Sequence, residues 1–129
     1  MNTSELSGNN LPTEMTVGGI TYEILSFMRD EDLNFVVDGD TMIERVKEMG
    51  AYLGKEDGEH ILKYQDDIPH DLRERGLLFA FPGWRALDNM DVYFTYWFKS
   101  DKKWVLRRFP LNSNGGSIWG RDTMVFRRK

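Results

Sequence analysis

The order of the hydrophobic periodicities constrains the fold of this chain more than any other feature. Helical spacing is confined to residues 41–66, whereas runs of strand length fill most of residues 77–129. Residues 92–98 alternate with the period of a β-strand. One predicted face carries Val92, Phe94, Tyr96 and Phe98, and the other carries Tyr93, Thr95 and Trp97. Other strand-length runs are residues 77–81, 104–109 and 123–127. Helices followed by a block of strands predict an α+β domain with the helices on one face of a mainly antiparallel sheet.

The beginning of the chain predicts a leader followed by one more strand. Residues 1–16 are polar and contain Pro12, so we expect a flexible leader. Ile20, Tyr22 and Ile24 then alternate with polar residues, which indicates a half-buried strand over residues 20–28. The sheet is therefore predicted to have four to five strands. A chain of 129 residues suits one compact domain, which we place at residues 17–129.

Two helices are predicted between the first strand and the later ones. Residues 41–44 have the form of a capping box, in which Thr41 is the cap and Glu44 reaches back to it. An apolar stripe follows at helical spacing, and Gly50 or Gly54 is expected to end the helix. Residues 55–58 are expected to be a connector, and a second helix to run over residues 59–66 until Pro69. We therefore predict a two-helix hairpin packed on the sheet. After it, Pro82-Gly83 is expected to end the strand of residues 77–81.

Charge is distributed unevenly along the chain. The net charge is -4, but residues 1–70 hold fifteen acids and five bases, while residues 101–129 hold two acids and eight bases. The sequence leaves two interpretations open. In one, the basic end packs beside the acidic helices and is neutralised by them. In the other, it creates a positive surface potential that attracts a partner.

Several functional classes lack the residues that they need. The chain has no Cys, which excludes disulfides and zinc–thiolate sites. It has no phosphate-binding glycine motif and no nucleophile elbow, so we expect no cofactor and no metal, and a non-enzymatic protein is favoured while enzyme status stays open. A small hydrolase built around His60 or His70 remains an alternative. No apolar run is long enough to span a membrane and no signal peptide is visible, so a cytoplasmic protein without a membrane partner is expected.

The candidate binding residues lie in the last third of the chain, where aromatic and basic side chains are interleaved. Indoles are common anchors in interfaces, and guanidinium groups orient a charged partner. The strand period places Trp104 and Arg108 on one face. The competing interpretation is that most of these rings fill the core. The predicted binding residues are Trp97, Trp104, Arg107, Arg108, Trp119, Arg121 and Arg127.

These observations predict a non-enzymatic interaction module that presents a basic, aromatic sheet face to a protein partner or an acidic ligand. A single-stranded nucleic-acid-binding protein using the same face is the alternative, because rings stack on bases while cations neutralise phosphates. The two hypotheses differ in salt response, which is steep for phosphate neutralisation. The oligomeric state is left open.

Two resemblances add to this interpretation. The fragments GITYEI (19–24), DGDTM (38–42), LGKEDG (53–58), QDDIP (65–69), GWR (83–85) and VFRRK (125–129) together resemble a group of short bacterial proteins to which no activity is assigned. That resemblance implies a cytosolic bacterial protein. The sequence GGSIW at residues 115–119, with Phe126-Arg127, is similar to the ending of C-type-lectin-like ligand-binding domains, although Ile118 interrupts the motif.

Overall fold

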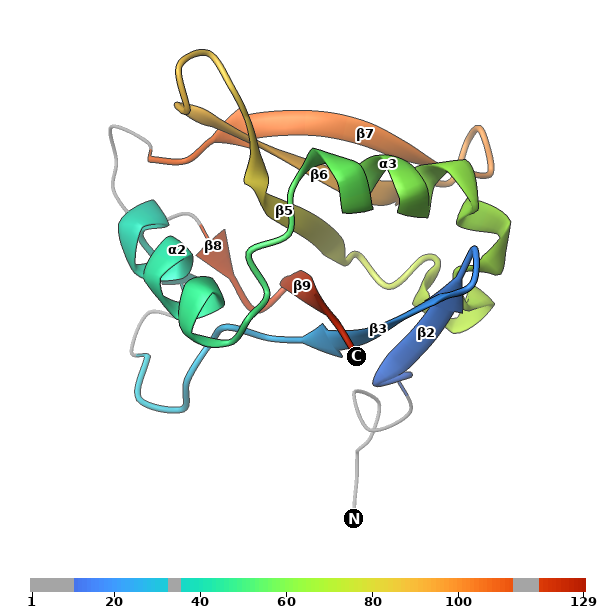
Figure 1. The fold of residues 1–129 in the computed structure, drawn as a ribbon, viewed down its shortest axis with the longest axis horizontal. Coiled ribbons are helices and arrows are strands. Elements are labelled where there is room, and N and C mark those ends of the chain that lie inside the picture. The colour runs from blue at the N-terminus through green and yellow to red at the C-terminus, as the bar shows by residue number, and fades with distance from the viewer. Residues whose placement is uncertain (1–10, 33–35, 113–118) are drawn as a thin grey trace.

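The computed structural model describes residues 11–32, 36–112 and 119–129. Within these ranges, six strands form the main sheet in the order β2-β3-β9-β5-β6-β7, and β4 pairs with β8 in a small second sheet. The strands are β2 (Glu14–Val17), β3 (Ile20–Leu25), β4 (Val36–Val37), β5 (Leu78–Ala86), β6 (Asp91–Phe98), β7 (Lys103–Pro110), β8 (Trp119–Gly120) and β9 (Thr123–Arg128). Figure 1 shows β2 and β3 at one side of the molecule and β7 at the other.

The α+β class, the two helices and the mostly antiparallel sheet are confirmed in the described residues, but the predicted number of four to five strands is wrong. The described part of the main sheet has six strands, and the sheet is mixed because β9 runs parallel to β5. The additional strand is β2, in which Met15 and Val17 are buried. It overlaps the end of the leader expected at residues 1–16, and residues 1–10 of that leader lie outside the described residues.

Helix α2 (Gly39–Glu48) begins three residues earlier than the predicted capping box implied. Its N-cap is Asp38, whose carboxylate accepts a hydrogen bond from the Thr41 amide at 2.7 Å, so Thr41 lies inside the helix. The helix ends at Glu48, and Gly50, one of the two glycines predicted to stop it, follows the C-cap Met49 with a left-handed φ of +72°. The Ala51 amide then donates to the Val46 carbonyl at 2.8 Å, which satisfies one of the last free carbonyls.

Helix α3 (Lys55–Lys63) includes the four residues expected to be a connector. It begins after Gly54, and its first turn carries Glu56 and Asp57, which favour the positive end of a helix dipole. Two short 3-10 helices follow, η1 (Gln65–Asp67) and η2 (His70–Leu72). Strand β5 also differs from the prediction, since it continues past Pro82-Gly83 to Ala86 through an irregular register with β6.

The two helices contribute to different halves of the core. Ile61 of α3 packs in one cluster with Phe79 and Phe81 of β5, whereas Met42 of α2 packs in a second cluster with Ala80. Successive strand residues point to opposite faces of a sheet. The helices therefore cover opposite faces, in place of the expected hairpin on one face. Figure 1 shows α2 beside β8 at one end of the molecule and α3 along β6 and β7.

A bidentate ion pair attaches the segment after β3 to α2. The Arg45 guanidinium donates to both carboxylate oxygens of Asp32, at 2.8 and 3.0 Å, and also to the Phe27 carbonyl at 3.1 Å. The hydrogen bond from Arg45, followed by one from the Arg29 amide, lowers the pKa of Asp32 from 3.8 to about 2.

This pair predicts a specific acid sensitivity. Because the pKa of Asp32 is lower in the folded state than its ordinary value, its contribution to stability is complete above about pH 4 and is lost as the pH falls towards 2. Asp32→Asn should flatten the pH dependence of the free energy of unfolding in that window. The exposed control Asp101→Asn should keep the wild-type profile. Equal profiles for Asp32→Asn and the wild type would contradict the assignment.

Gly58 gives a second prediction, because α3 approaches β5 closely at this residue. A Cβ at Gly58 would lie 2.5 Å from the Trp84 ring and 3.2 Å from Phe81. Gly58→Ala should therefore lower the free energy of unfolding by about 1–3 kcal/mol, although alanine is the better helix former. Glu59→Ala, on the exposed face of the same helix, should change it by less than about 0.5 kcal/mol. Thermal and denaturant unfolding measure both.

Candidate functional site

Two of the predicted aromatic anchors are core residues. Trp104 and Trp119 are each only 3% exposed. The Trp104 ring packs edge-on against Phe79, with ring centroids 5.5 Å apart, and the Trp119 indole N–H donates to the Leu111 carbonyl at 2.8 Å. Neither indole is available to a partner in this fold, because the strand face on which each was predicted is covered by its own core cluster.

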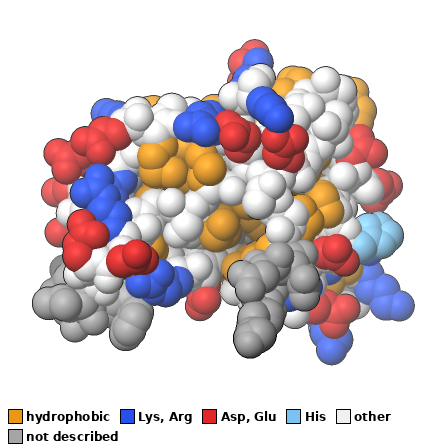
Figure 2. Space-filling view, turned by 90° about the horizontal axis from the view of Figure 1, so that it is seen from below, with side chains coloured by type: hydrophobic (Ala, Val, Ile, Leu, Met, Phe, Trp, Pro, Cys, Tyr) orange, Lys and Arg blue, Asp and Glu red, His pale blue; other side chains and the backbone are white. Residues whose placement is uncertain are grey.

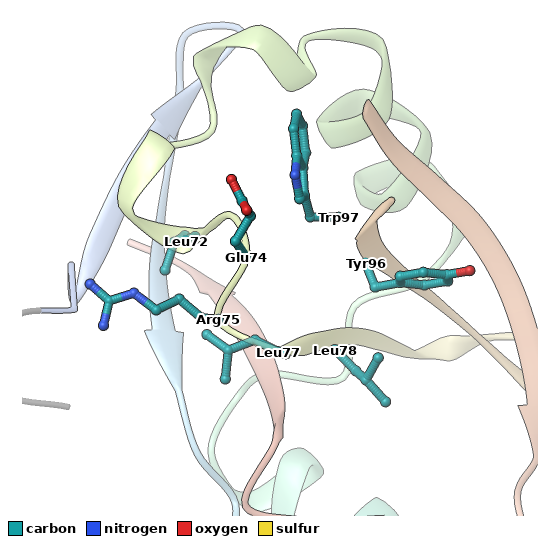
Figure 3. Close-up of a pocket in the computed structure, with 8 residues that line it drawn as sticks. Leu72, Glu74, Arg75, Leu77, Leu78, Tyr96 and Trp97 are labelled. Atoms are coloured by element: carbon teal, nitrogen blue, oxygen red, sulfur yellow. The ribbon is translucent and has the colours of Figure 1, made fainter. Parts of the chain in front are cut away.

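Trp97 is half-buried beside a small cavity. The Arg73 guanidinium lies 4.2 Å from its ring centroid, so part of the ring is already engaged in a cation–π contact. The adjacent cavity of about 110 Å³ is lined by residues that include Glu74 and Leu77. Figure 3 shows Glu74 turned towards Trp97 and Arg75 directed away from the cavity. Small-molecule sites usually measure about 300–1,000 Å³, so this cavity is too small for one.

The arginines of β9 are held by acidic residues of neighbouring elements. Arg127 bonds to the Glu23 carboxylate at 2.7 and 2.8 Å and donates to the Met49 carbonyl at 3.0 Å. Arg128 donates to Asp57 at 2.7 Å. The positive charge of Arg121 is one of the causes that lower the pKa of Asp32. The β9 part of the basic end is thus neutralised by the acidic first half, as in one of the two outcomes that the sequence left open.

A buried carboxylate lies at the centre of this neutralisation. Asp57 is 7% exposed and accepts hydrogen bonds from the Tyr22 hydroxyl at 2.8 Å and from Arg128. Burial, with the hydrogen bond to Asp57, raises the pKa of Tyr22, so its hydroxyl stays protonated and acts as a donor. A carboxylate that accepts from two protein donors connects α3 to β3 and β9.

The histidines and the GGSIW motif were the remaining candidates for a site. The ring Nε2 of His60 lies 2.8 Å from the Val17 carbonyl, which fixes the side chain against β2. Among the described residues, no three His, Asp or Glu side chains are grouped so that they could hold a metal. The GGSIW motif at residues 115–119 lies, apart from Trp119, outside the described residues. No helix in the described ranges has the length and apolarity to cross a membrane.

Strand β7 carries two of the predicted cations, Arg107 and Arg108, and both are exposed; Arg121, in the turn before β9, is exposed as well. The β7 sequence KWVLRRFP contains three basic residues and no acid, and the four residues from Arg107 to Pro110 are all exposed. The register places Arg107 beside Phe94 and Arg108 beside Tyr93, so the two guanidinium groups lie on opposite faces of the strand. The Arg108 guanidinium is 47% exposed and lies 3.5 Å from Asp91. Elsewhere, on the β2–β3 side, Figure 2 shows acidic and basic side chains interspersed.

The outer edge of β7 is closed at one residue by a side chain. In the described ranges β7 is the last strand of the main sheet. At Trp104 the side-chain amide of Gln65 occupies the place of a further strand, because its Oε1 accepts from the Trp104 amide at 2.8 Å and its Nε2 donates to the Trp104 carbonyl at 3.3 Å. Sequence reasoning missed Gln65, since a glutamine after a helix carries no local sign that it contacts a strand 39 residues later.

Comparison of the chain with protein-family models, curated proteins and solved structures finds no match. The functional argument therefore rests on the geometry of β7 and its neighbours.

The burial of Trp104 gives a prediction that separates core residues from surface residues. Trp104→Ala should lower the free energy of unfolding by about 3–5 kcal/mol, because it removes a buried indole. Phe109→Ala, at a ring that is 45% exposed, should cost less than about 1 kcal/mol. Chemical denaturation of both variants measures the difference. Comparable losses for the two would contradict the assignment of Trp104 to the core.

Proposed function

We propose that this protein is a non-enzymatic binding module that takes an acidic protein segment at the exposed part of β7. The observation that carries the proposal is the combination of three cations and no acid on one strand with the exposure of its last four residues. Such a surface attracts a negatively charged segment and accelerates encounter with it. The binding residues are then Lys103, Arg107 and Arg108, with Phe109 as the exposed ring.

An acidic protein segment is favoured over single-stranded nucleic acid. Nucleic-acid binders of this kind stack successive bases on exposed flat rings. In this fold Trp104 and Trp119 are buried, and Trp97 is partly covered by Arg73, so the rings expected to stack on bases are largely unavailable. A cytoplasmic location is part of the proposal, because a chain without Cys has none of the disulfides that are typical of proteins in oxidising compartments.

The test is binding of a fluorescent Glu-rich peptide, compared with a fluorescent oligonucleotide of equal charge. The double variant Arg107→Glu, Arg108→Glu should weaken peptide binding at least about tenfold, because two attractive charges become repulsive. The control Lys55→Glu, at an exposed cation on α3, should change it less than about twofold. Affinity should fall as salt rises from about 50 to about 300 mM.

Three outcomes would contradict the proposal. One is the absence of peptide binding at low salt. Another is equal binding by the double variant and the wild type. The third is tighter binding of the oligonucleotide than of the peptide, which would support the nucleic-acid alternative.

A further inference from the structure

We infer that the acidic segment binds by strand addition, pairing its backbone with the outer edge of β7 at Leu106 and Arg108. This inference rests on the proposed function and specifies how its partner is recognised. It follows from the direction of the backbone groups of β7, from the two features that end the edge, and from a groove beside Leu106.

The backbone groups of Leu106 and Arg108 point away from β6. In an antiparallel pair, successive residues alternate between bonding to the partner strand and facing outward. Trp104 faces outward, since both its amide and its carbonyl bond to Gln65. The Val105 carbonyl faces β6, where it accepts from the Thr95 hydroxyl at 2.7 Å. The alternation therefore turns the amide and carbonyl of Leu106 and of Arg108 outward.

The open edge is bounded at both ends. Gln65 occupies the bonding groups of Trp104, and Pro110, the next outward residue after Arg108, has no amide hydrogen to donate. A partner strand is thus offered two donors and two acceptors at Leu106 and Arg108. The Leu106 carbonyl already accepts one hydrogen bond from the Arg107 guanidinium at 3.0 Å, and its second lone pair is the one that the added strand would use. This short length defines the register of the added strand, because a shift in either direction would lose backbone bonds.

A groove beside this edge determines what the partner carries opposite Leu106. The groove measures about 390 Å³ and is lined by Leu62, Gln65, Lys103, Trp104, Val105, Leu106 and Arg107. A residue directly opposite Leu106 on an added strand points to the same face as Leu106. Its side chain therefore enters the groove between Leu106 and Leu62, where an apolar group gains contact and removes apolar surface from water.

The neighbouring positions of the partner call for acidic residues. The residue opposite Arg107 shares one face with that guanidinium, and the residue opposite Arg108 shares the other face with the second. Antiparallel addition is the more stable arrangement per residue. Read from its N-terminus, the partner strand is then acid, acid, apolar, placed opposite Arg108, Arg107 and Leu106 in turn.

The same cations oppose pairing of β7 with a second copy of itself. An antiparallel pair of two β7 edges that joins Leu106 of each copy to Arg108 of the other would place the two Arg107 residues directly opposite each other. Like charges directly opposite each other destabilise a strand pair, and charged edges are a common protection against aggregation. The edge is therefore selective for an acidic strand.

N-methylated peptides test the strand addition directly. In the proposed register, the amides of the apolar residue and of the first acid donate to β7, whereas the amide of the middle acid faces solvent. N-methylation at the apolar residue should weaken binding at least about tenfold, since it removes a hydrogen bond and blocks the approach of the strand. N-methylation at the middle acid is the matched control and should change binding less than about threefold.

Failure of this inference is distinguishable from failure of the proposed function. Equal effects of the two N-methyl groups, with retained sensitivity to Arg107→Glu, Arg108→Glu, would overturn strand addition and leave an acidic partner in place. Equal affinity for peptides in the orders acid-acid-apolar and apolar-acid-acid would overturn the register. Loss of all acidic-peptide binding would overturn both.

Gln65→Ala tests the boundary of the edge. Removing the amide frees the backbone groups of Trp104, so a peptide longer by two residues beyond its apolar position should gain at least about threefold in affinity for the variant and nothing for the wild type. Circular dichroism and a thermal melt establish that the variant is folded. A folded Gln65→Ala protein that does not distinguish the two peptide lengths would contradict the role of Gln65.

Discussion

Strand β9 is the element on which the sheet depends, because it joins two strand groups that are otherwise unconnected by hydrogen bonds. It pairs antiparallel with β3 on one side and parallel with β5 on the other. Its residues fill both halves of the core, with Val125 completely buried in one and Phe126 in the other. The Phe126 ring stacks on Phe79 with centroids 5.1 Å apart and also contacts Tyr22 and Phe81. The basic residues at the end of β9 thus belong to an internal strand of the sheet.

The internal position of β9 explains why the proposed binding surface is an edge and not a sheet face. Its arginines lie beside the acidic elements β3 and α3, where Glu23 and Asp57 neutralise them. Both faces of the central strands are covered, one by α3 and the other by α2. Strand β7 is farthest in the sheet from β2 and β3, and its cations Lys103, Arg107 and Arg108 are exposed.

An exposed edge is a risk that folded proteins limit, and this molecule limits it in three ways. A side chain closes the edge at Trp104, a proline removes a donor at residue 110, and positive charge discourages self-pairing. These devices protect the edge and, in the proposed binding mode, also define what it accepts, since a short acidic strand matches the groups that they leave open. Protection and recognition therefore have the same physical origin at β7.

Local features could be predicted from the sequence alone. They are the alternation of residues 92–98, the glycine stop at Gly50 just after α2, and the α+β order of the elements. These depend on side-chain period and backbone preference, which are properties of neighbouring residues. Three features became visible in the tertiary structure and not before. Trp104 is a core residue, Arg127 is paired with Glu23, and Gln65 closes the edge of β7. Each of those outcomes depends on which strands become neighbours across the sheet, and residues distant in the sequence carry no local pattern that records such a pairing.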